Sequence, residues 1–376
     1  MEDIGLYIHI PFCKSKCFYC DFNSYAGKEK LQDEYVECLI SEMKMRSNVL
    51  KNKNVVSIYI GGGTPTYLNP GALRRLLQFI KSMGFVNIEY SCEANPGTLT
   101  DEKLHIMKEN GINRLSIGLQ SWNNKILEFL GRIHSLEDFL SNYQVARALK
   151  FNNINIDLMF SIQGQTVDEF DNTLENVTAL NPEHISCYSL IIEKGTLFYD
   201  KYKKGEIREI DEEIDRQMYY NAIDILNEKG YHQYEISNFA RCGFECRHNI
   251  IYWKTKSYLG IGAGAHSYLD GMRSSNEVLP EKYISSIKKG KLPVSQREVL
   301  TLDDMMEEFM FMGLRMTEGV FLSEFKTRFN KDIFEIYGKQ IEMLQKCKLL
   351  DIKDGRLFLT KRGIDISNQV FVQFMF

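Results

Sequence analysis

The sequence lacks several features that would assign it to a functional class at once. It has no run of the roughly 18–20 apolar residues that a membrane-spanning helix needs, no internal repeat, and only 7 prolines and 2 tryptophans among 376 residues. Its formal net charge of -4 offers no broad basic surface to nucleic acid or to an anionic membrane. We therefore expect a cytoplasmic globular protein with no nucleic-acid partner and no transmembrane segment, for which only transient membrane contact stays open.

Cysteine, in contrast, is unevenly placed. There are nine cysteines, an odd number, in a chain long enough to fold without disulfide bonds. The first residues, MEDIGLYIHI, begin with acids instead of a basic and apolar leader, so we expect no secretory signal peptide. In a reducing compartment, cysteines are more often metal ligands, catalytic groups or small buried side chains. Three of them, Cys13, Cys17 and Cys20, fall within eight residues.

The first two thirds of the chain alternates short apolar runs with amphipathic helical stretches. The runs predict six strands, at residues 6–10, 55–60, 88–93, 114–119, 154–160 and 184–190. Near-continuous apolar strands separated by helices indicate a parallel sheet covered by helices. Six such units, where a complete TIM barrel has eight, predict an incomplete α/β barrel of the (β/α)6 type. Reactive groups in such barrels gather in the loops that follow the strands.

We divide the chain into three parts. Residues 1–235 are expected to form the barrel core, and residues 236–300 a connecting region with further strands and Gly-rich turns. Residues 301–376 are expected to be mainly helical and to end in a hairpin with Asp354-Gly355 at its turn. Helices followed by a short hairpin are typical of a winged-helix-like domain, but without a basic surface we assign it no DNA binding.

The spacing of the clustered cysteines points to a metal centre. In HIPFCKSKCFYCDF they stand at i, i+4 and i+7, so one loop can wrap three thiolates around one soft metal site. A structural zinc site usually takes four ligands in two pairs, and no second pair lies at that spacing. Cubane iron–sulfur clusters ordinarily take four thiolates, so three would leave one iron open. Zinc with a distant fourth ligand, and three ordinary cysteines, stay open as alternatives.

This CxxxCxxC spacing, preceded by YIHIPF, resembles the cluster motif of the radical S-adenosylmethionine (SAM) superfamily. Nearly the whole chain resembles the branch that contains the oxygen-independent coproporphyrinogen III oxidases and their heme chaperone relatives. The resemblance implies a radical SAM-type barrel with an oxygen-sensitive [4Fe–4S] cluster on Cys13, Cys17 and Cys20, whose open iron is chelated by SAM. It also implies that the cofactor carries the difficult chemistry while the protein positions it.

A Gly-rich turn follows the second expected strand. Gly61-Gly62-Gly63-Thr64 lets the backbone approach a bound carboxylate closely, and it resembles the GGTP motif of the family. The resemblance implies cofactor-binding roles for Tyr7, Tyr19, Gly62, Gly63, Thr64, Glu93, Gln120, Arg132, Asp157 and Ile191. The acids suit ribose or ammonium groups and Arg132 suits a carboxylate. His266, in GIGAGAHSYL, is a further candidate beside the adenine or heme, with a packed histidine in a Gly-rich turn as the alternative. The segment FSIQGQT at residues 160–166 departs from the expected Gly-Leu-Pro-Gly-Gln-Thr, so its loop conformation does not carry over.

Three features favour the heme chaperone branch over the oxidase. Phe22 stands where the oxidase motif has a fourth cysteine, and only six residues precede Tyr7, where the oxidase carries an extension. The segment RHNIIYW at residues 247–253 matches the HNxxYW signature of the chaperones. His248 is thus a candidate ligand of heme iron, and Tyr252 and Trp253 offer flat apolar faces. A structural histidine and a core tryptophan are the alternative.

Two further cysteines, Cys242 and Cys246, precede this signature. We expect free thiols, with ligation of heme or a metal as the alternative.

From the sequence we therefore expect a heme chaperone, built on a radical SAM scaffold, that binds heme and transfers it to an acceptor protein. Its expected partners are heme, that acceptor, and a flavodoxin- or ferredoxin-like electron donor. A radical SAM enzyme of porphyrin biosynthesis, of the oxygen-independent coproporphyrinogen III oxidase type, is the first alternative. A cluster-bearing regulatory protein without turnover is the second. Enzymatic activity is left undecided, and activity as the oxidase is not expected.

Overall fold

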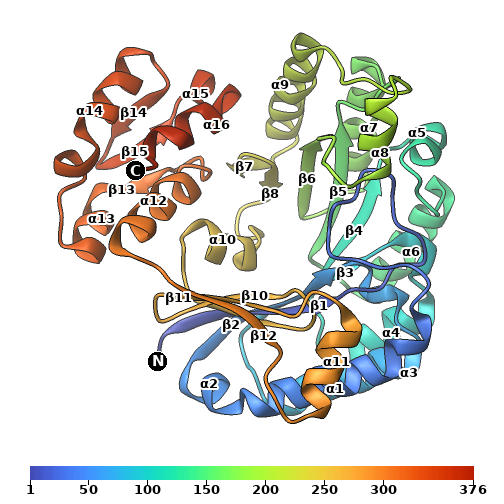
Figure 1. Ribbon diagram of the computed structural model, residues 1–376. Coiled ribbons are helices and arrows are strands. Elements are labelled where there is room, and N and C mark those ends of the chain that lie inside the picture. The colour runs from blue at the N-terminus through green and yellow to red at the C-terminus, as the bar shows by residue number, and fades with distance from the viewer.

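The computed structural model describes residues 1–376, and its centre is a twelve-stranded sheet that bends into a partial barrel (Figure 1). Six neighbouring strands, each parallel to the next, form the barrel. They are β1 (Asp3–Ile10), β2 (Asn54–Gly62), β3 (Glu89–Ala94), β4 (Arg114–Gln120), β5 (Ile154–Phe160) and β6 (His184–Ser189). All six strands predicted from the apolar runs are present, with small differences at their ends.

Nine helices connect these strands and follow the last of them. They are α1 (Gln32–Met45), α2 (Ser47–Asn52), α3 (Pro70–Ser82), α4 (Asp101–Glu109), α5 (Asn124–Phe129), α6 (Leu136–Ala148), α7 (Val167–Ala179), α8 (Leu197–Lys203) and α9 (Glu212–Glu228). Side-chain caps fix where several of them begin: Ser135 and Thr166 each form a capping box, at α6 and α7. Helix α1 buries Tyr35, Leu39 and Met43 against the sheet, the face that its periodicity predicts.

Residues 232–299 add strands to both edges of the barrel sheet, so most of the region expected to be a connection, residues 236–300, belongs to that sheet. Strands β7 (His232–Glu235) and β8 (Asn238–Ala240) extend it beyond β6, and β9 (Tyr258–Ile261) pairs in parallel with β1. Strands β10 (His266–Leu269), β11 (Met272–Asn276) and β12 (Val294–Val299) continue that edge, and α11 (Pro280–Lys288) packs on α1. Helix α10 (Arg247–Trp253) lies inside the bend of the sheet (Figure 1).

Residues from 302 onward form a separate unit with its own apolar core of 18 buried residues, beside a main core of 57. Its elements are α12 (Leu302–Gly313), β13 (Val320–Phe321), α13 (Leu322–Phe329), α14 (Ile333–Lys346), β14 (Leu350–Lys353), β15 (Arg356–Leu359), α15 (Lys361–Asp365) and α16 (Ser367–Phe371). Asp354 and Gly355, at φ 51° and 73°, make the tight turn between β14 and β15. Helices followed by a hairpin are what the sequence predicts for this unit, and the structure adds β13 to the hairpin as a third strand.

Short 3-10 turns complete the chain, at Glu29–Leu31, Pro65–Tyr67, Pro96–Thr98 and Val372–Phe374. No helix combines the length and the apolar character that crossing a membrane requires. In the FSIQGQT loop, Ser161 adopts the left-handed conformation with φ 63° at the position where the expected run has glycine. The loop therefore has a glycine-like backbone at a residue that carries a side chain.

Candidate functional site

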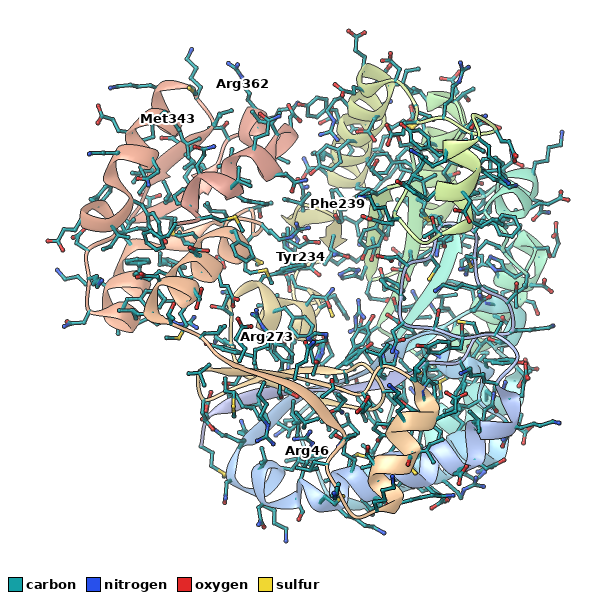
Figure 2. The ribbon with its side chains drawn as sticks, viewed as in Figure 1. Arg46, Tyr234, Phe239, Arg273, Met343 and Arg362 are labelled. Carbon is teal, nitrogen blue, oxygen red and sulfur yellow. The ribbon has the colours of Figure 1, made fainter.

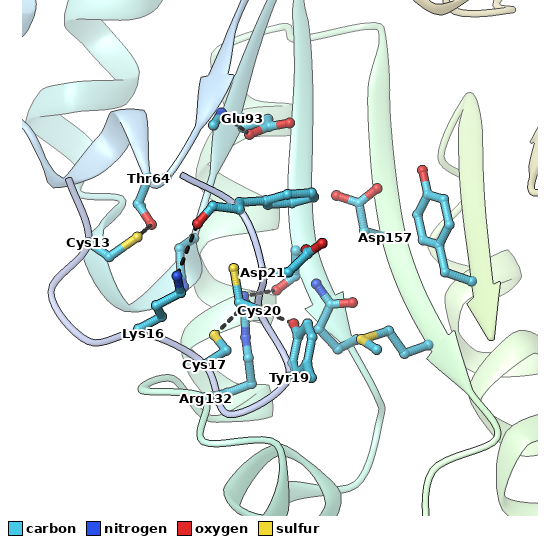
Figure 3. Close-up of a pocket in the computed structure, with 18 of the residues that line it drawn as sticks. Cys13, Lys16, Cys17, Tyr19, Cys20, Asp21, Thr64, Glu93, Arg132 and Asp157 are labelled. Carbon is cyan, nitrogen blue, oxygen red and sulfur yellow. Dashed lines mark hydrogen bonds between the residues drawn. The ribbon is translucent and has the colours of Figure 1, made fainter. Parts of the chain in front are cut away.

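A cavity of about 440 Å³ opens where the six parallel strands end, and all three clustered cysteines line it (Figure 3). Its wall takes residues from each strand or the loop after it: Cys13 to Phe22 after β1, Gly62 to Pro65 after β2, and Glu93 to Asn95 after β3. Gln120 ends β4, Asp157 lies in β5, and residues 188–191 end β6. The carboxyl ends of the strands thus form the site, as expected for this barrel type.

The three cysteines are free thiols held by hydrogen bonds from the cavity wall. The Thr64 hydroxyl donates to Cys13 Sγ at 3.5 Å, and Arg132 Nη1 donates to Cys17 Sγ at 3.4 Å (Figure 3). Burial raises the pKa of the Cys13 and Cys20 thiols above the usual value, so a bound metal would have to displace those protons.

No three His, Cys, Asp or Glu side chains converge on a position for one metal ion. This spacing does not conflict with a four-iron cube, because there each thiolate binds a different iron and the sulfurs need not meet at one point.

Arg132 supplies a buried positive charge beside the cysteine loop. Its Nη2 donates to the Gly118 carbonyl at 2.7 Å, and its Nη1 also reaches the Tyr19 hydroxyl at 3.5 Å. Its Nε has no partner, although buried donors are nearly always paired. A guanidinium with a free donor in a cavity wall fits an anionic ligand such as a carboxylate.

Two carboxyl groups line the same cavity. Glu93 accepts hydrogen bonds from the Tyr59 hydroxyl at 2.9 Å and from Gly62 N at 3.0 Å. Burial first, and then the neighbouring Asp157, raise the pKa of Glu93 to about 7. Burial also raises the pKa of Asp157, which accepts from Asn155 Nδ2 at 2.7 Å and from Ser116 Oγ at 3.1 Å. A cationic ligand such as an ammonium group would favour the ionised forms of both acids.

The Gly-rich turn leaves no room for side chains. A Cβ on Gly62, which has φ 109°, would lie 2.3 Å from the His9 ring, and one on Gly63 would lie 2.8 Å from two carbonyl oxygens of the cysteine loop. The backbone of the turn therefore packs directly against that loop. Gln120, also in the cavity wall, has φ 74°, a strained conformation that often marks a functional site. The wall as a whole fits a cluster and SAM: free thiols, a spare guanidinium donor, a tight glycine turn and two acids.

Most of the predicted site residues meet in this cavity. They are Cys13, Cys17, Tyr19, Cys20, Gly62, Gly63, Thr64, Glu93, Gln120, Arg132, Asp157 and Ile191. Tyr7 and His266 do not line it. The Tyr7 hydroxyl instead meets His9 Nδ1 at 2.9 Å, and His266 begins β10, which is separated from β1 by β9.

The cavity also contains residues that the sequence analysis did not select, among them Tyr59, Ser116, Met159 and Tyr188. The available signal was the period-two alternation along the strands. Tyr59 stands two residues before Gly61 and thus faces the same side of β2 as the Gly-rich turn.

The HNxxYW residues lie in α10 and do not line the cavity. His248 is buried, with Nδ1 2.9 Å from Ser57 Oγ and Nε2 2.9 Å from the Tyr252 hydroxyl. Burial, together with the charge of Arg114, lowers the pKa of His248 to about 3, so the ring is neutral. Neither ring nitrogen is free, and ligation of heme iron by His248 would require one of these hydrogen bonds to break. The role of His248 in heme binding stays a prediction.

Trp253, Cys242 and Cys246, the other predicted residues near α10, lie in different surroundings. Trp253 packs against Arg315, whose guanidinium carbon lies 4.7 Å from the centre of its ring. Cys242 is exposed, whereas Cys246 is buried with its Sγ 3.5 Å from Glu89 Oε1. Neither cysteine is in a disulfide, and the absence of a ligand role for both stays a prediction.

Comparison with known proteins adds three findings. Residues 7–177 match the family model described as the radical SAM superfamily, and residues 300–366 match that of the HemN C-terminal domain. The proteins named heme chaperone HemW from Bacillus subtilis and from Lactococcus lactis are each 37% identical to this chain. The alignments cover 98% of this chain in both cases, and 98% and 96% of the relatives.

A solved structure of the Escherichia coli coproporphyrinogen III oxidase HemN, a radical SAM enzyme, superposes with a TM-score of 0.86. The superposition covers 99% of this chain and 90% of that one, at 23% sequence identity. The predicted fold, an incomplete radical SAM-type barrel with a C-terminal helical unit, is confirmed.

Proposed function

Because this chain belongs to the radical SAM superfamily, and within it to the family of the heme chaperone HemW, we propose that it binds heme and transfers it to an acceptor protein. The observation that carries the proposal is the similarity to the Bacillus subtilis heme chaperone, 37% identity over 98% of both chains. The likeness to the oxidase structure, at 23% identity, supports only the shared fold.

In this proposal Cys13, Cys17 and Cys20 hold a [4Fe–4S] cluster and leave one iron open for SAM. Thr64 and Arg132, which donate hydrogen bonds to two of the thiols, would stay as donors to the cluster ligands and tune its potential. The Gly-rich turn and the free donor of Arg132 suit the carboxylate of SAM, and the acids Glu93 and Asp157 suit its ammonium or ribose. When bound, the cofactor supplies one-electron chemistry, and the chain holds and orients it.

Phe22 is the residue that weighs against an oxidase. It stands where the oxidase motif has its fourth cysteine, and its side chain is 62% exposed at the cavity. A phenylalanine there removes a thiol and adds an apolar group at the cavity wall.

The proposal includes three partners and a place of action. Heme is the cargo, a heme-binding protein is the acceptor, and a flavodoxin- or ferredoxin-like protein supplies electrons to the cluster. We propose that the chain acts in the cytosol, where reducing conditions keep its cysteines as thiols.

The test is anaerobic reconstitution of the full chain with iron and sulfide, followed by absorption and EPR spectra with and without heme. We expect about four iron atoms per chain on the cysteine loop, and stoichiometric heme binding. The triple variant Cys13→Ala/Cys17→Ala/Cys20→Ala should lose the cluster, while the exposed-thiol control Cys347→Ala should keep it.

Three results would contradict the proposal. Zinc in place of iron, or a cluster that survives in the triple variant, would remove the cofactor assignment. Decarboxylation of coproporphyrinogen III by the reconstituted chain would make it an oxidase.

A further inference from the structure

The HNIIYW segment is the sequence motif that the cavity leaves unexplained. Helix α10, which carries it, lies inside the bend of the barrel sheet (Figure 1). Glu89, at the start of β3, holds the first turn of α10, since its carboxylate accepts from the backbone N of Arg247 at 3.0 Å and of His248 at 3.2 Å. The helix is therefore fixed to the barrel strands.

One line of contacts runs from α10 to Glu93. His248 is held by the Ser57 and Tyr252 hydroxyls, and its ring stacks on Tyr59 with centroids 5.2 Å apart and planes 24° apart. Tyr59 in turn lines the cavity and donates its hydroxyl to Glu93 at 2.9 Å. The imidazole of the motif thus sets the plane of the tyrosine that orients a cavity carboxylate.

A second line runs from α10 to Asp157. The backbone N of Cys246, the residue before α10, donates to the Tyr234 hydroxyl at 3.3 Å. Tyr234, at the centre of the molecule (Figure 2), meets His184 Nε2 at 2.8 Å. On its other side His184 Nδ1 lies 2.6 Å from Asn155 Oδ1, and Asn155 Nδ2 donates to Asp157 at 2.7 Å. Because the Asn155 oxygen only accepts, His184 donates from Nδ1 and accepts from Tyr234, so every bond of the line has a defined direction.

Arg114 joins the two lines electrostatically. It is only 2% exposed, and its Nε and Nη1 have no hydrogen-bond partner. Its charge favours the ionised forms of both Glu93 and Asp157, and it also attracts Glu89, which holds the start of α10. The buried charge of Arg114 thus interacts with Glu89, which holds α10, and with both acids of the cavity.

We propose that α10 is a positioning element of the cofactor cavity: His248 orients Glu93 through Tyr59, and the start of α10 orients Asp157 through Tyr234, His184 and Asn155. The inference rests on the proposed function, because it takes the cavity to bind SAM. It assigns the HNxxYW motif to cofactor placement, with His248 as a neutral spacer between strands, and not as a ligand of heme iron.

The experiment titrates SAM into the cluster-loaded full chain and follows the EPR spectrum of the reduced cluster. His248→Phe and Tyr59→Phe should each weaken SAM affinity by about tenfold, which corresponds to one lost orienting hydrogen bond or contact. The double variant should be no weaker than either single one, since both changes break the same line. His248→Gln, whose amide can still bond to Ser57, should recover part of the affinity. The control His105→Gln, on the exposed side of α4, should change nothing.

Heme binding by the same variants separates this inference from the alternatives. We expect His248→Phe to take up heme with unchanged stoichiometry. Loss of heme binding with normal SAM affinity would make His248 a heme ligand. If the loss of SAM affinity in the double variant equals the product of the two single losses, His248 does not act through Tyr59.

Either of these two results overturns the inference. If His248→Phe does not fold, the variants Tyr59→Phe and Tyr234→Phe, which each remove one hydroxyl, test the inference instead. Unchanged SAM affinity in both of these variants also overturns the inference. A wild-type chain that binds SAM but no heme would end the proposed function and leave this inference standing.

Discussion

At the scale of single residues, the interior of this barrel is polar where most cores are apolar. Glu93, Asp157, His184 and His248 all point from strands or from α10 into the barrel, and each has at least one hydrogen-bond partner there. Burying such groups is costly unless they are paired. Their presence in apolar strands is therefore a local sign of a site, and it agrees with the family resemblance that selected Glu93 and Asp157.

Glu93 should make the stability of the cofactor-free chain depend on pH. Burial raises its folded pKa from 4.5 to about 7, so its contribution to the unfolding free energy is full below pH 4.5 and is lost as the pH rises through about 7. Glu93→Gln stays neutral throughout. Between pH 4 and pH 8 its stability relative to the parent chain should therefore rise by about 2–3 kcal/mol. Urea unfolding across this range measures the difference.

The exposed control Glu109→Gln should follow the pH profile of the parent chain. A Glu93→Gln variant whose profile also coincides with the parent would mean that the pKa of Glu93 is the same in the folded and unfolded chain, and hence that Glu93 is better solvated than its position indicates.

At the scale of elements, α10 is too short to be stable by itself, and its environment supplies both of its ends. Glu89 accepts from its first N–H groups, and Arg328 from α13 donates to the carbonyls of Lys254 and Thr255 at its other end, at 3.3 and 2.9 Å. A carboxylate at the N-terminal end and a guanidinium at the C-terminal end both interact favourably with the helix dipole. The element is therefore defined by residues distant in the chain.

Removing the anchor at the start of α10 should be strongly destabilising. Glu89→Ala leaves the N–H groups of Arg247 and His248 without their acceptor and removes an acid whose charge acts on the buried Arg114. We expect a loss of about 3 kcal/mol in the free energy of unfolding, measured by urea denaturation. Glu298→Ala on the exposed strand β12 is the matched control and should stay within about 0.5 kcal/mol of the parent. Equal stabilities of the two variants would contradict the anchoring role of Glu89.

At the scale of the whole molecule, the C-terminal unit contacts the rest of the protein at several places. The backbone of Arg315 and Thr317 bonds to Ile236 and Tyr234, and Met316 shares a small apolar cluster with Tyr234. Arg328 reaches the end of α10, and Asp365 on α15 accepts from Arg216 at 3.4 Å and from the Tyr220 hydroxyl, both on α9. The two apolar cores remain separate. The unit is thus joined to the barrel by hydrogen bonds, ion pairs and one small apolar cluster, and Arg328 contributes one part of that attachment.

Arg328→Ala should loosen that attachment. It removes three hydrogen bonds to the end of α10, including one of 2.6 Å to Thr255 Oγ1, and should cost about 2 kcal/mol. Calorimetry should show the C-terminal unit melting before the barrel, with faster hydrogen exchange in α10. Lys346→Ala, which breaks only an exposed pair with Glu342 on α14, should leave a single transition unchanged. A single unshifted transition in Arg328→Ala would place the main attachment elsewhere.

The sequence by itself determined most of the elements and drew attention to the cysteine loop. Strand periodicity and the Asp354-Gly355 turn are local signals, and each is found in the structure where it was expected. The spacing of Cys13, Cys17 and Cys20 is local as well, so the loop could be recognised without the fold.

Only the tertiary structure decided where the distant residues meet. His248 and Ser57 are 191 positions apart, and no periodicity links them, yet their contact places the HNxxYW motif inside the barrel. Tyr7 and His266 were expected beside the cofactor, but neither lines the cavity: the Tyr7 hydroxyl meets His9, and His266 begins β10, beyond β9. A local pattern reports the backbone conformation and which side of an element is buried. Which residue the element contacts on that side depends on how the helices and strands pack together in the folded chain.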